Sequence, residues 1–194
     1  MSRIFIFDGH PASESISRVI VDAYADAARD NGHEIRIQHL DEMEFDADHG
    51  MGGYRSSKPL EASLEQFLDS LAWANHIVLA TPMWWGGLPA KTKGLFDRAL
   101  LPGRAFDPRE SVCGAPKPLL SGRSARVFVT SDTPGWAMRL LYRNALFHQV
   151  RKQLFGFVGI KPTRISHLNA ASHPTPEKIS QWRCTAARLG RSAR

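Results

Sequence analysis

The sequence predicts an α/β protein in which one parallel β-sheet carries helices on both faces. Short apolar runs alternate along the chain with longer segments whose apolar residues recur at helical spacing. The apolar runs are nearly unbroken, which is typical of strands buried on both faces of a parallel sheet. Because strands and helices alternate and 194 residues fit one domain, we expect a single domain over residues 1–194.

The first elements follow from apolar runs and their stops. Residues 3–7 form a β-branched and aromatic run that Asp-Gly ends, so we expect the first and central strand there. Residues 15–30 place apolar side chains at helical spacing before Asn31-Gly32, a pair that favours a left-handed stop. Residues 34–40 alternate between apolar and polar, which predicts a strand exposed on one side at a sheet edge.

The middle of the chain continues the alternation. Residues 41–59 are polar and rich in glycine and methionine, which predicts a long irregular connection. Leucine and phenylalanine at helical spacing predict a helix around residues 60–71. The apolar residues 77–80 predict a third strand, and residues 88–101 a third helix.

In the last part of the chain, an irregular stretch first interrupts the alternation of strands and helices. Residues 102–121 contain four prolines, which predicts an irregular excursion. Strands are then expected at residues 126–130 and 163–168, separated by one helix over residues 139–156. A final helix is expected at residues 176–189.

Charge and hydropathy narrow the function classes. The net charge of +6 comes from the last part of the chain, where residues 139–194 carry eleven Lys and Arg against one acid. These cations lack the basic and aromatic repeats of RNA-binding motifs, so we expect a solvated basic face and no nucleic-acid partner. No apolar stretch approaches the roughly 20 residues that span a bilayer. We therefore expect no membrane segment or secretory signal, and a cytoplasmic location.

In a parallel α/β sheet, ligands bind beyond the carboxyl ends of the strands where the strand order reverses. The loop at residues 8–17 joins a strand to a helix and carries Ser13, Ser15 and Ser17 with no lysine or arginine. Helix-start N–H groups and hydroxyls can cradle a phosphate, with His10 as a further contact. The alternative is that Ser13 or Ser15 only caps the helix.

Two further loops lie at strand ends. Residues 81–87 place Trp84 and Trp85 where the chain leaves a buried strand, and Gly86 permits close backbone approach. The tryptophans can line a planar ring; alternatively, they plug the top of the core or a subunit interface. Residues 130–138 can offer hydroxyl and amide donors, although turn formation alone explains their composition.

Three motifs occur in order along the chain: His10-Pro11-x4-Ser15-Ile16-Ser17, then Pro82-Met83-Trp84-Trp85-x3-Pro89-Ala90-x2-Lys93-Gly94-x2-Asp97-Arg98, and then Thr130-Ser131. With these motifs the chain resembles the flavodoxin-2 family of NAD(P)H:quinone oxidoreductases. The resemblance implies a flavodoxin-like fold with sheet order 2-1-3-4-5 and a tightly held flavin.

The resemblance also implies which residues hold the flavin. The phosphate loop would comprise His10, Ser15, Ile16 and Ser17. The loop around the ring would comprise Pro82, Met83, Trp84, Trp85 and Gly86. The loop at the polar edge of the ring would comprise Thr130, Ser131, Asp132 and Thr133. Asp132-Thr133-Pro134 stands where the mammalian quinone reductase of this family carries a Gly-Gly pair, so we expect the side chains of the substrate pocket to differ here.

The activity implied is two-electron transfer from NAD(P)H to a quinone or similar acceptor by a ping-pong mechanism, with FMN as the expected cofactor and FAD as the alternative. The flavin carries the chemistry, so no catalytic side chain is assigned. An ancillary flavoprotein that regulates a membrane transporter is the alternative function. The sequence pI of about 9.7 argues against an acidic flavodoxin-type electron carrier. Hydrolase motifs and a metal-ligand cluster are not found, so no metal is expected.

We also expect a homodimer. The stretch 139–156 carries more apolar surface than one contact between a helix and a sheet requires, through Leu140, Leu141, Ala145, Leu146, Phe147 and Val150. A second copy would cover these side chains and the exposed tryptophans, and would complete the wall of the site.

Overall fold

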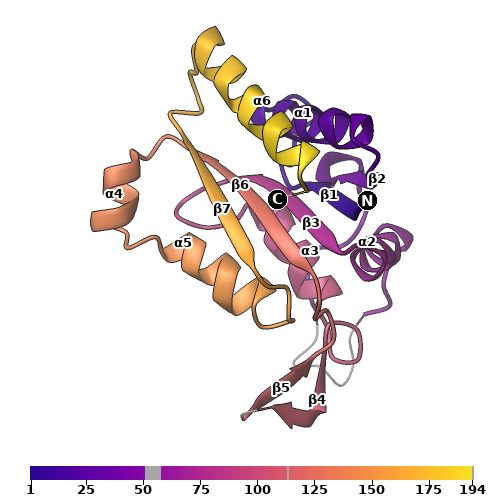
Figure 1. The fold of residues 1–194 in the computed structure, drawn as a ribbon. Helices are drawn as coiled ribbons and strands as arrows, with labels where there is room; N and C mark the ends of the chain where they lie inside the picture. Colours follow the sequence, from indigo (N-terminus) through magenta and orange to yellow (C-terminus); the bar gives the residue numbers. More distant parts are fainter. Residues whose placement is uncertain (51–57, 113, 194) are drawn as a thin grey trace.

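The computed structural model describes residues 1–50, 58–112 and 114–193, and it confirms the flavodoxin-like α/β fold. Five parallel strands form one sheet in the order β2-β1-β3-β6-β7, which matches the expected order 2-1-3-4-5 (Figure 1). The strands are β1 (Arg3–Asp8), β2 (Glu34–His39), β3 (His76–Pro82), β6 (Ser124–Ser131) and β7 (Thr163–Asn169). Strand β1 lies inside the sheet between β2 and β3, as expected for the first strand, and β3 holds the middle position.

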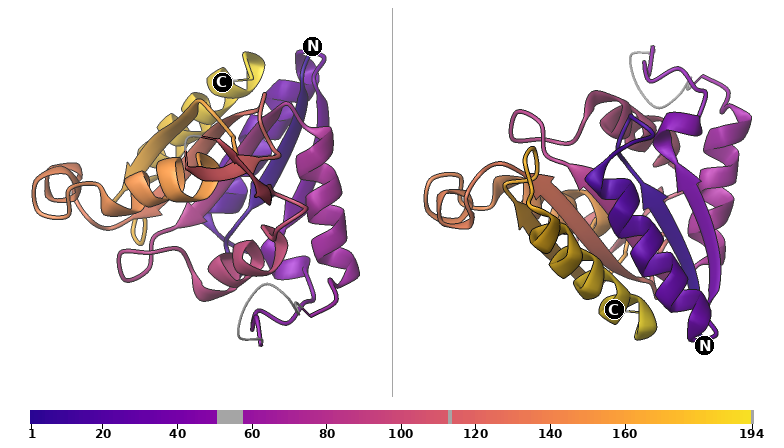
Figure 2. Two further views of the ribbon diagram at one scale, coloured as in Figure 1. Left: turned by 90° about the horizontal axis from the view of Figure 1, so that it is seen from below. Right: turned by 90° about the horizontal axis from the view of Figure 1, so that it is seen from above.

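Two helical layers cover the sheet. Helices α1 (Ile16–Asp30) and α6 (Pro176–Arg191) pack side by side on one face (Figure 2). Helices α2 (Ala62–Trp73) and α3 (Ala90–Ala99) cover the other face together with α5 (Ala145–His148) and the π-helix η2 (Gln149–Phe155). The two faces differ in their cores because successive strand side chains point to opposite sides. Ile4 and Ile6 of β1 face α1, whereas Phe5 and Phe7 face α2.

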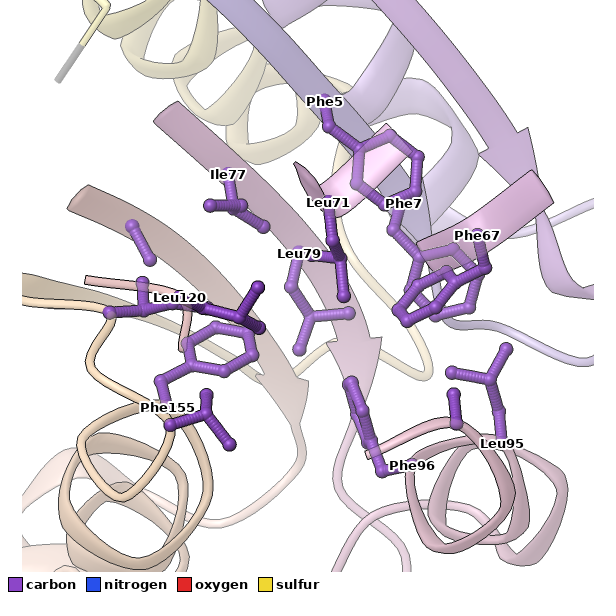
Figure 3. Packing of buried hydrophobic residues seen from close by; sticks show 14 of the residues in the cluster. Phe5, Phe7, Phe67, Leu71, Ile77, Leu79, Leu95, Phe96, Leu120 and Phe155 are labelled. Carbon is purple, nitrogen blue, oxygen red and sulfur yellow. The ribbon is translucent and has the colours of Figure 1, made fainter. Parts of the chain in front are cut away.

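The core on the α2 and α3 side is aromatic. The rings of Phe5 and Phe7 lie edge-on to Phe67 of α2, with centroid distances of 5.4 and 5.1 Å, and Phe96 of α3 meets the same ring at 6.1 Å (Figure 3). Burial of such rings is a main source of folding free energy. This packing fixes the strands whose ends carry the candidate site.

Two expected elements are wrong. The stretch 102–121 contains an antiparallel hairpin, β4 (Phe106–Val112) and β5 (Ala115–Pro118), that projects from the sheet (Figure 1). Its register shifts between Asp107 and Ser111, a bulge that accommodates Pro108 without a ladder hydrogen bond.

The expected single helix over residues 139–156 is broken. Helix α4 (Gly135–Leu140) ends early, and Arg143 and Asn144 adopt left-handed backbone conformations before α5 begins. A helix cannot continue through residues with positive φ, because this reverses the direction of the helical turn. Consequently α4 projects beyond the carboxyl end of β6 and lies apart from α5 (Figure 1).

The structure also describes the end of α1 and the start of the connection after β2. Gly32 has φ of 75° after α1, as the Asn31-Gly32 stop predicts. The connection expected over residues 41–59 begins within a short 3-10 turn, η1 (Leu40–Glu42), and its residues 51–57 lie outside the described residues. No helix in the described ranges is both long and apolar enough to cross a membrane.

Candidate functional site

Two adjoining cavities lie at the carboxyl edge of the sheet, where β1, β3 and β6 end. The smaller cavity has a volume of about 280 Å³ and the larger one about 540 Å³. Met83, Ser131 and Asp132 line both cavities. The strand order reverses between β1 and β3, which is where α/β sheets of this kind bind ligands.

The first loop brings two serines to the smaller cavity in different roles. Ser15 caps α1, since its Oγ accepts a hydrogen bond from the backbone N–H of Arg18 at 3.0 Å. The side chain of Ser17 is buried, with 1% of the residue exposed, and its Oγ has no hydrogen-bond partner among the described residues. An unpartnered buried hydroxyl costs free energy unless a ligand satisfies it.

His10 forms one wall of the same cavity. Its Nδ1 accepts from the backbone N–H of Ala12 at 3.0 Å, and its ring lies edge-on to Trp84 at a centroid distance of 5.8 Å. The first two strand-end loops therefore meet through these two aromatic side chains.

Arg18, in the first turn of α1, is already paired. Its guanidinium lies 3.5 Å from the buried carboxylate of Asp8 and 3.1 Å from Asp41. Asp8 also lies 3.6 Å from Nδ1 of His39. The loop thus offers hydroxyls and helix-start N–H groups to an anion and no unpaired arginine, as its composition predicts.

The second loop is a tight turn with an unusual residue in it. The backbones of Trp84 and Gly87 exchange hydrogen bonds of 3.0 and 2.9 Å around Trp85 and Gly86. Trp85 has φ of 51° and Gly86 has φ of 78°, the pattern of a type I′ turn. Tryptophan at positive φ is strained, and such strain concentrates at functional sites.

Both tryptophans point away from the core. Trp84 is 47% exposed and Trp85 is fully exposed, so the alternative in which the pair plugs the top of the core is wrong. Trp84 lines the smaller cavity and Trp85 the larger one. Large exposed aromatics beside a cavity are typical of surfaces that bind a ligand or a partner.

The third loop holds a fixed negative charge. The carboxylate of Asp132 accepts from the backbone N–H of Ser172 at 2.8 Å and from the hydroxyl of Ser172. These hydrogen bonds hold the pKa of Asp132 below its usual range, so the carboxylate is ionised at neutral pH. Asp132 itself is therefore an acceptor at the boundary between the cavities, not one of the donors expected from this loop.

The structure brings all of the expected site residues to these two cavities. Ten of them line the smaller one: His10, Ser15, Ile16, Ser17, Pro82, Met83, Trp84, Thr130, Ser131 and Asp132. The other three, Trp85, Gly86 and Thr133, line the larger one. Their contact with a flavin remains a prediction.

Sequence reasoning missed several lining residues. Ala171 and Ser172 complete the smaller cavity, and the end of β7 at the same sheet edge is the signal that indicates them. Met138, Tyr142, Ala145 and Leu146 complete the larger cavity. The break between α4 and α5 at residues 143 and 144 brings these four side chains to the larger cavity. The sequence predicts one continuous helix over this stretch, so it does not indicate them.

The comparison with known families identifies the family of the chain. The family model described as flavodoxin-like fold matches residues 2–189. The chain belongs to the flavodoxin-2 family.

Individual relatives share about 30% identity with part of the chain. An FMN-dependent NADH:quinone oxidoreductase of Ruegeria pomeroyi is 30% identical over 134 residues, which cover 61% of this flavodoxin-2 chain and 64% of that relative. The chain thus spans just under two thirds of that relative's length. An FMN-dependent NADH:quinone oxidoreductase of Pseudomonas syringae pv. tomato is 29% identical over 167 residues, with 80% and 78% covered.

The fold is shared with a solved NAD(P)H:quinone oxidoreductase from Methanothermobacter marburgensis. The TM-score is 0.80 at 20% identity, over 98% of this chain and 95% of the other. At this identity the likeness shows the fold alone.

Proposed function

We propose that this protein is an FMN-dependent NAD(P)H:quinone oxidoreductase. The observation that carries the proposal is the buried, unpartnered hydroxyl of Ser17 at the start of α1, inside the smaller cavity. A phosphate monoester fits this place, because it supplies an acceptor for the hydroxyl and a negative charge for the helix N-terminus. The relatives named as FMN-dependent quinone oxidoreductases support the same cofactor.

Different residues of the chain would bind the phosphate, the ring and the polar edge of FMN. Ser15, Ser17 and the N–H groups at the start of α1 would bind the phosphate. Trp84 and the turn that it begins would flank the ring, and Thr130 to Thr133 would meet its polar edge. Bound there, FMN would supply two-electron transfer between NAD(P)H and a quinone.

FMN is favoured over FAD by the relatives, which are named as FMN-dependent. The smaller cavity of about 280 Å³ extends from Ser17 to Asp132 and is bounded by His10, Trp84 and Ser172. An adenosine moiety would need a further groove beyond the first loop. Chromatography of the released flavin distinguishes the two.

The larger cavity fits the substrates. It is lined by the apolar side chains of Met83, Trp85, Met138 and Leu146, with Tyr142 on its rim. A nicotinamide and a quinone are both flat and largely apolar, and both would use this one space. Two substrates that share one space must bind in turn, so we propose a ping-pong mechanism.

We further propose that the protein is a homodimer whose partner covers α4. Trp136, Leu140, Leu141 and Tyr142 are all more than half exposed, between 58% and 68%. An apolar patch of this kind beside a ligand cavity marks an interface. Leu146 and Val150 are buried within the chain, so these two side chains cannot serve the interface expected from the sequence.

The test of the function is spectroscopic. Protein purified with its flavin should be yellow, should bleach when NADH or NADPH is added without oxygen, and should recover its colour when a quinone is added. Protein that takes up no FMN would refute the proposal. Protein that binds FMN but is not bleached by either nicotinamide would refute the reductase and favour the transporter-regulating alternative.

A further inference from the structure

A serine and a histidine form a close pair on the wall of the substrate cavity. Ser131 is the last residue of β6 and lines both cavities, and its Oγ lies 2.8 Å from Nε2 of His167 on the neighbouring strand β7. The imidazole stands behind the serine, since His167 does not line either cavity. The hydroxyl is thus the group through which His167 can act on a bound molecule.

Packing fixes the imidazole and keeps it neutral. The ring of Phe147 on α5 lies edge-on to it at a centroid distance of 5.5 Å. Burial lowers the pKa of His167, so the neutral ring predominates at neutral pH. A neutral imidazole carries its proton on one nitrogen and accepts on the other. When Nε2 carries it, Nε2–H donates to Ser131 and the serine O–H is directed to another acceptor.

The proposed reaction needs one proton beyond those that NAD(P)H supplies. Its balance is NAD(P)H plus quinone plus one proton, giving NAD(P)⁺ and hydroquinone. NAD(P)H provides two electrons and one proton, so the second proton must reach a quinone oxygen from the protein or from solvent. General acid groups that touch the reacting molecule typically accelerate such steps by about 10²–10⁴-fold.

We propose that His167 supplies this proton through the hydroxyl of Ser131, an inference that rests on the proposed function. The O–H of Ser131 donates to the quinone oxygen while Nε2–H of His167 reprotonates the serine, and Nδ1 takes up the replacement proton from solvent. His167 is a positioning residue, because it acts only through Ser131. The ionised Asp132 has no proton to give, which leaves the phenol of Tyr142 as the competing titratable donor among the residues that line this cavity.

Two electron acceptors separate proton supply from electron transfer. A quinone takes up two electrons and two protons, whereas ferricyanide takes up one electron and no proton. In the FMN-loaded protein, His167→Gln keeps a hydrogen-bond donor for Ser131 but cannot relay a proton. We expect the re-oxidation of reduced protein by quinone to slow at least tenfold, while re-oxidation by ferricyanide and bleaching by NAD(P)H stay within twofold.

Two further variants test whether free imidazole restores proton supply and whether Tyr142 is the proton donor. His167→Ala should lose quinone turnover and recover it when free imidazole is added, because imidazole can carry the proton into the space left by the ring. Tyr142→Phe removes the competing phenol from the cavity wall, and a quinone step that slows in this variant but not in His167→Gln would assign the proton to Tyr142. Nitrogen NMR of the flavin-free full chain gives a readout independent of turnover: Ser131→Ala should shift the Nε2 resonance of His167 and change its tautomer ratio.

The outcomes decide between the proposals. Equal losses with quinone and ferricyanide, a quinone rate unchanged in His167→Gln, or a loss confined to Tyr142→Phe would each overturn the proton relay while the reductase stands. A wild-type protein that oxidises NAD(P)H with neither acceptor overturns the proposed function, and the relay falls with it.

Discussion

Replacing Ser17 by alanine should separate flavin binding from folding. The Ser17 hydroxyl is buried and has no hydrogen-bond partner among the described residues. Removing a buried, unsatisfied hydroxyl takes away a desolvation cost in the flavin-free protein. We therefore expect Ser17→Ala to leave the free energy of unfolding of the flavin-free protein unchanged or to raise it by up to about 1 kcal/mol.

The same substitution should weaken FMN binding. A hydrogen bond from a hydroxyl to a charged phosphate contributes about 1.5–3 kcal/mol. Since about 1.4 kcal/mol corresponds to a factor of ten, the Kd for FMN should rise roughly 10- to 150-fold. Titration of FMN into flavin-free protein, followed by quenching of tryptophan fluorescence, measures this Kd.

Ser15→Ala should show a different pattern. Ser15 caps α1 through its hydrogen bond from the N–H of Arg18, so its loss should lower the free energy of unfolding by about 1 kcal/mol. Ser13→Ala is the matched control, because Ser13 lies in the same loop, is exposed and lines neither cavity. The double variant Ser15→Ala/Ser17→Ala should lose its flavin during purification while keeping its helical circular dichroism.

One result would refute this reasoning. If Ser17→Ala binds FMN within twofold of the wild type, the first loop does not hold the phosphate. If Ser17→Ala instead unfolds at markedly lower urea concentration without flavin, the hydroxyl has a structural partner and the argument from its burial fails.

Three further predictions concern other parts of the molecule. Trp85→Ala should change the free energy of unfolding by less than about 1 kcal/mol because the side chain is fully exposed, yet it should raise the KM for quinone; a loss of several kcal/mol in urea unfolding would contradict this. Leu140→Asp/Leu141→Asp should convert a dimer into a 21.6 kDa monomer by light scattering, and a fully active wild-type monomer would refute the shared interface. Burial, with the nearby Arg126, lowers the pKa of His76 to about 4, whereas the unfolded chain takes up this proton below about 6.5. The stability that neutral His76 contributes is therefore complete above pH 6.5 and is lost as the pH falls toward 4, by at most about 3 kcal/mol. Urea unfolding at pH 7 and pH 4.5 should show a smaller drop in the free energy of unfolding for His76→Gln than for the wild type.

Local patterns in the sequence determined the elements and the loops of the site. The apolar run of β1, the helical spacing in α1 and the Gly32 stop depend on neighbouring residues, so periodicity and backbone preference predict them. The position of the loops follows as well, because parallel strands place their carboxyl ends at one edge. The strand order came from the family resemblance, since the spacing of strands along a chain does not state which strands pair.

Tertiary structure alone decided what depends on partners far apart in the chain. The prolines of β4 and β5 argue against strands in the sequence, because proline cannot donate a ladder hydrogen bond. Whether a proline disrupts a strand depends on whether it lies opposite a ladder partner or at a bulge, and only the folded structure decides this. The left-handed backbone at Arg143 and Asn144, which turns part of an apparent helix into a cavity wall, has no glycine to indicate it. The pairing of Ser131 with His167 and of Asp132 with Ser172 joins residues 36 and 40 positions apart, and only the β6–β7 register and the loop that follows β7 bring those atoms within hydrogen-bonding distance.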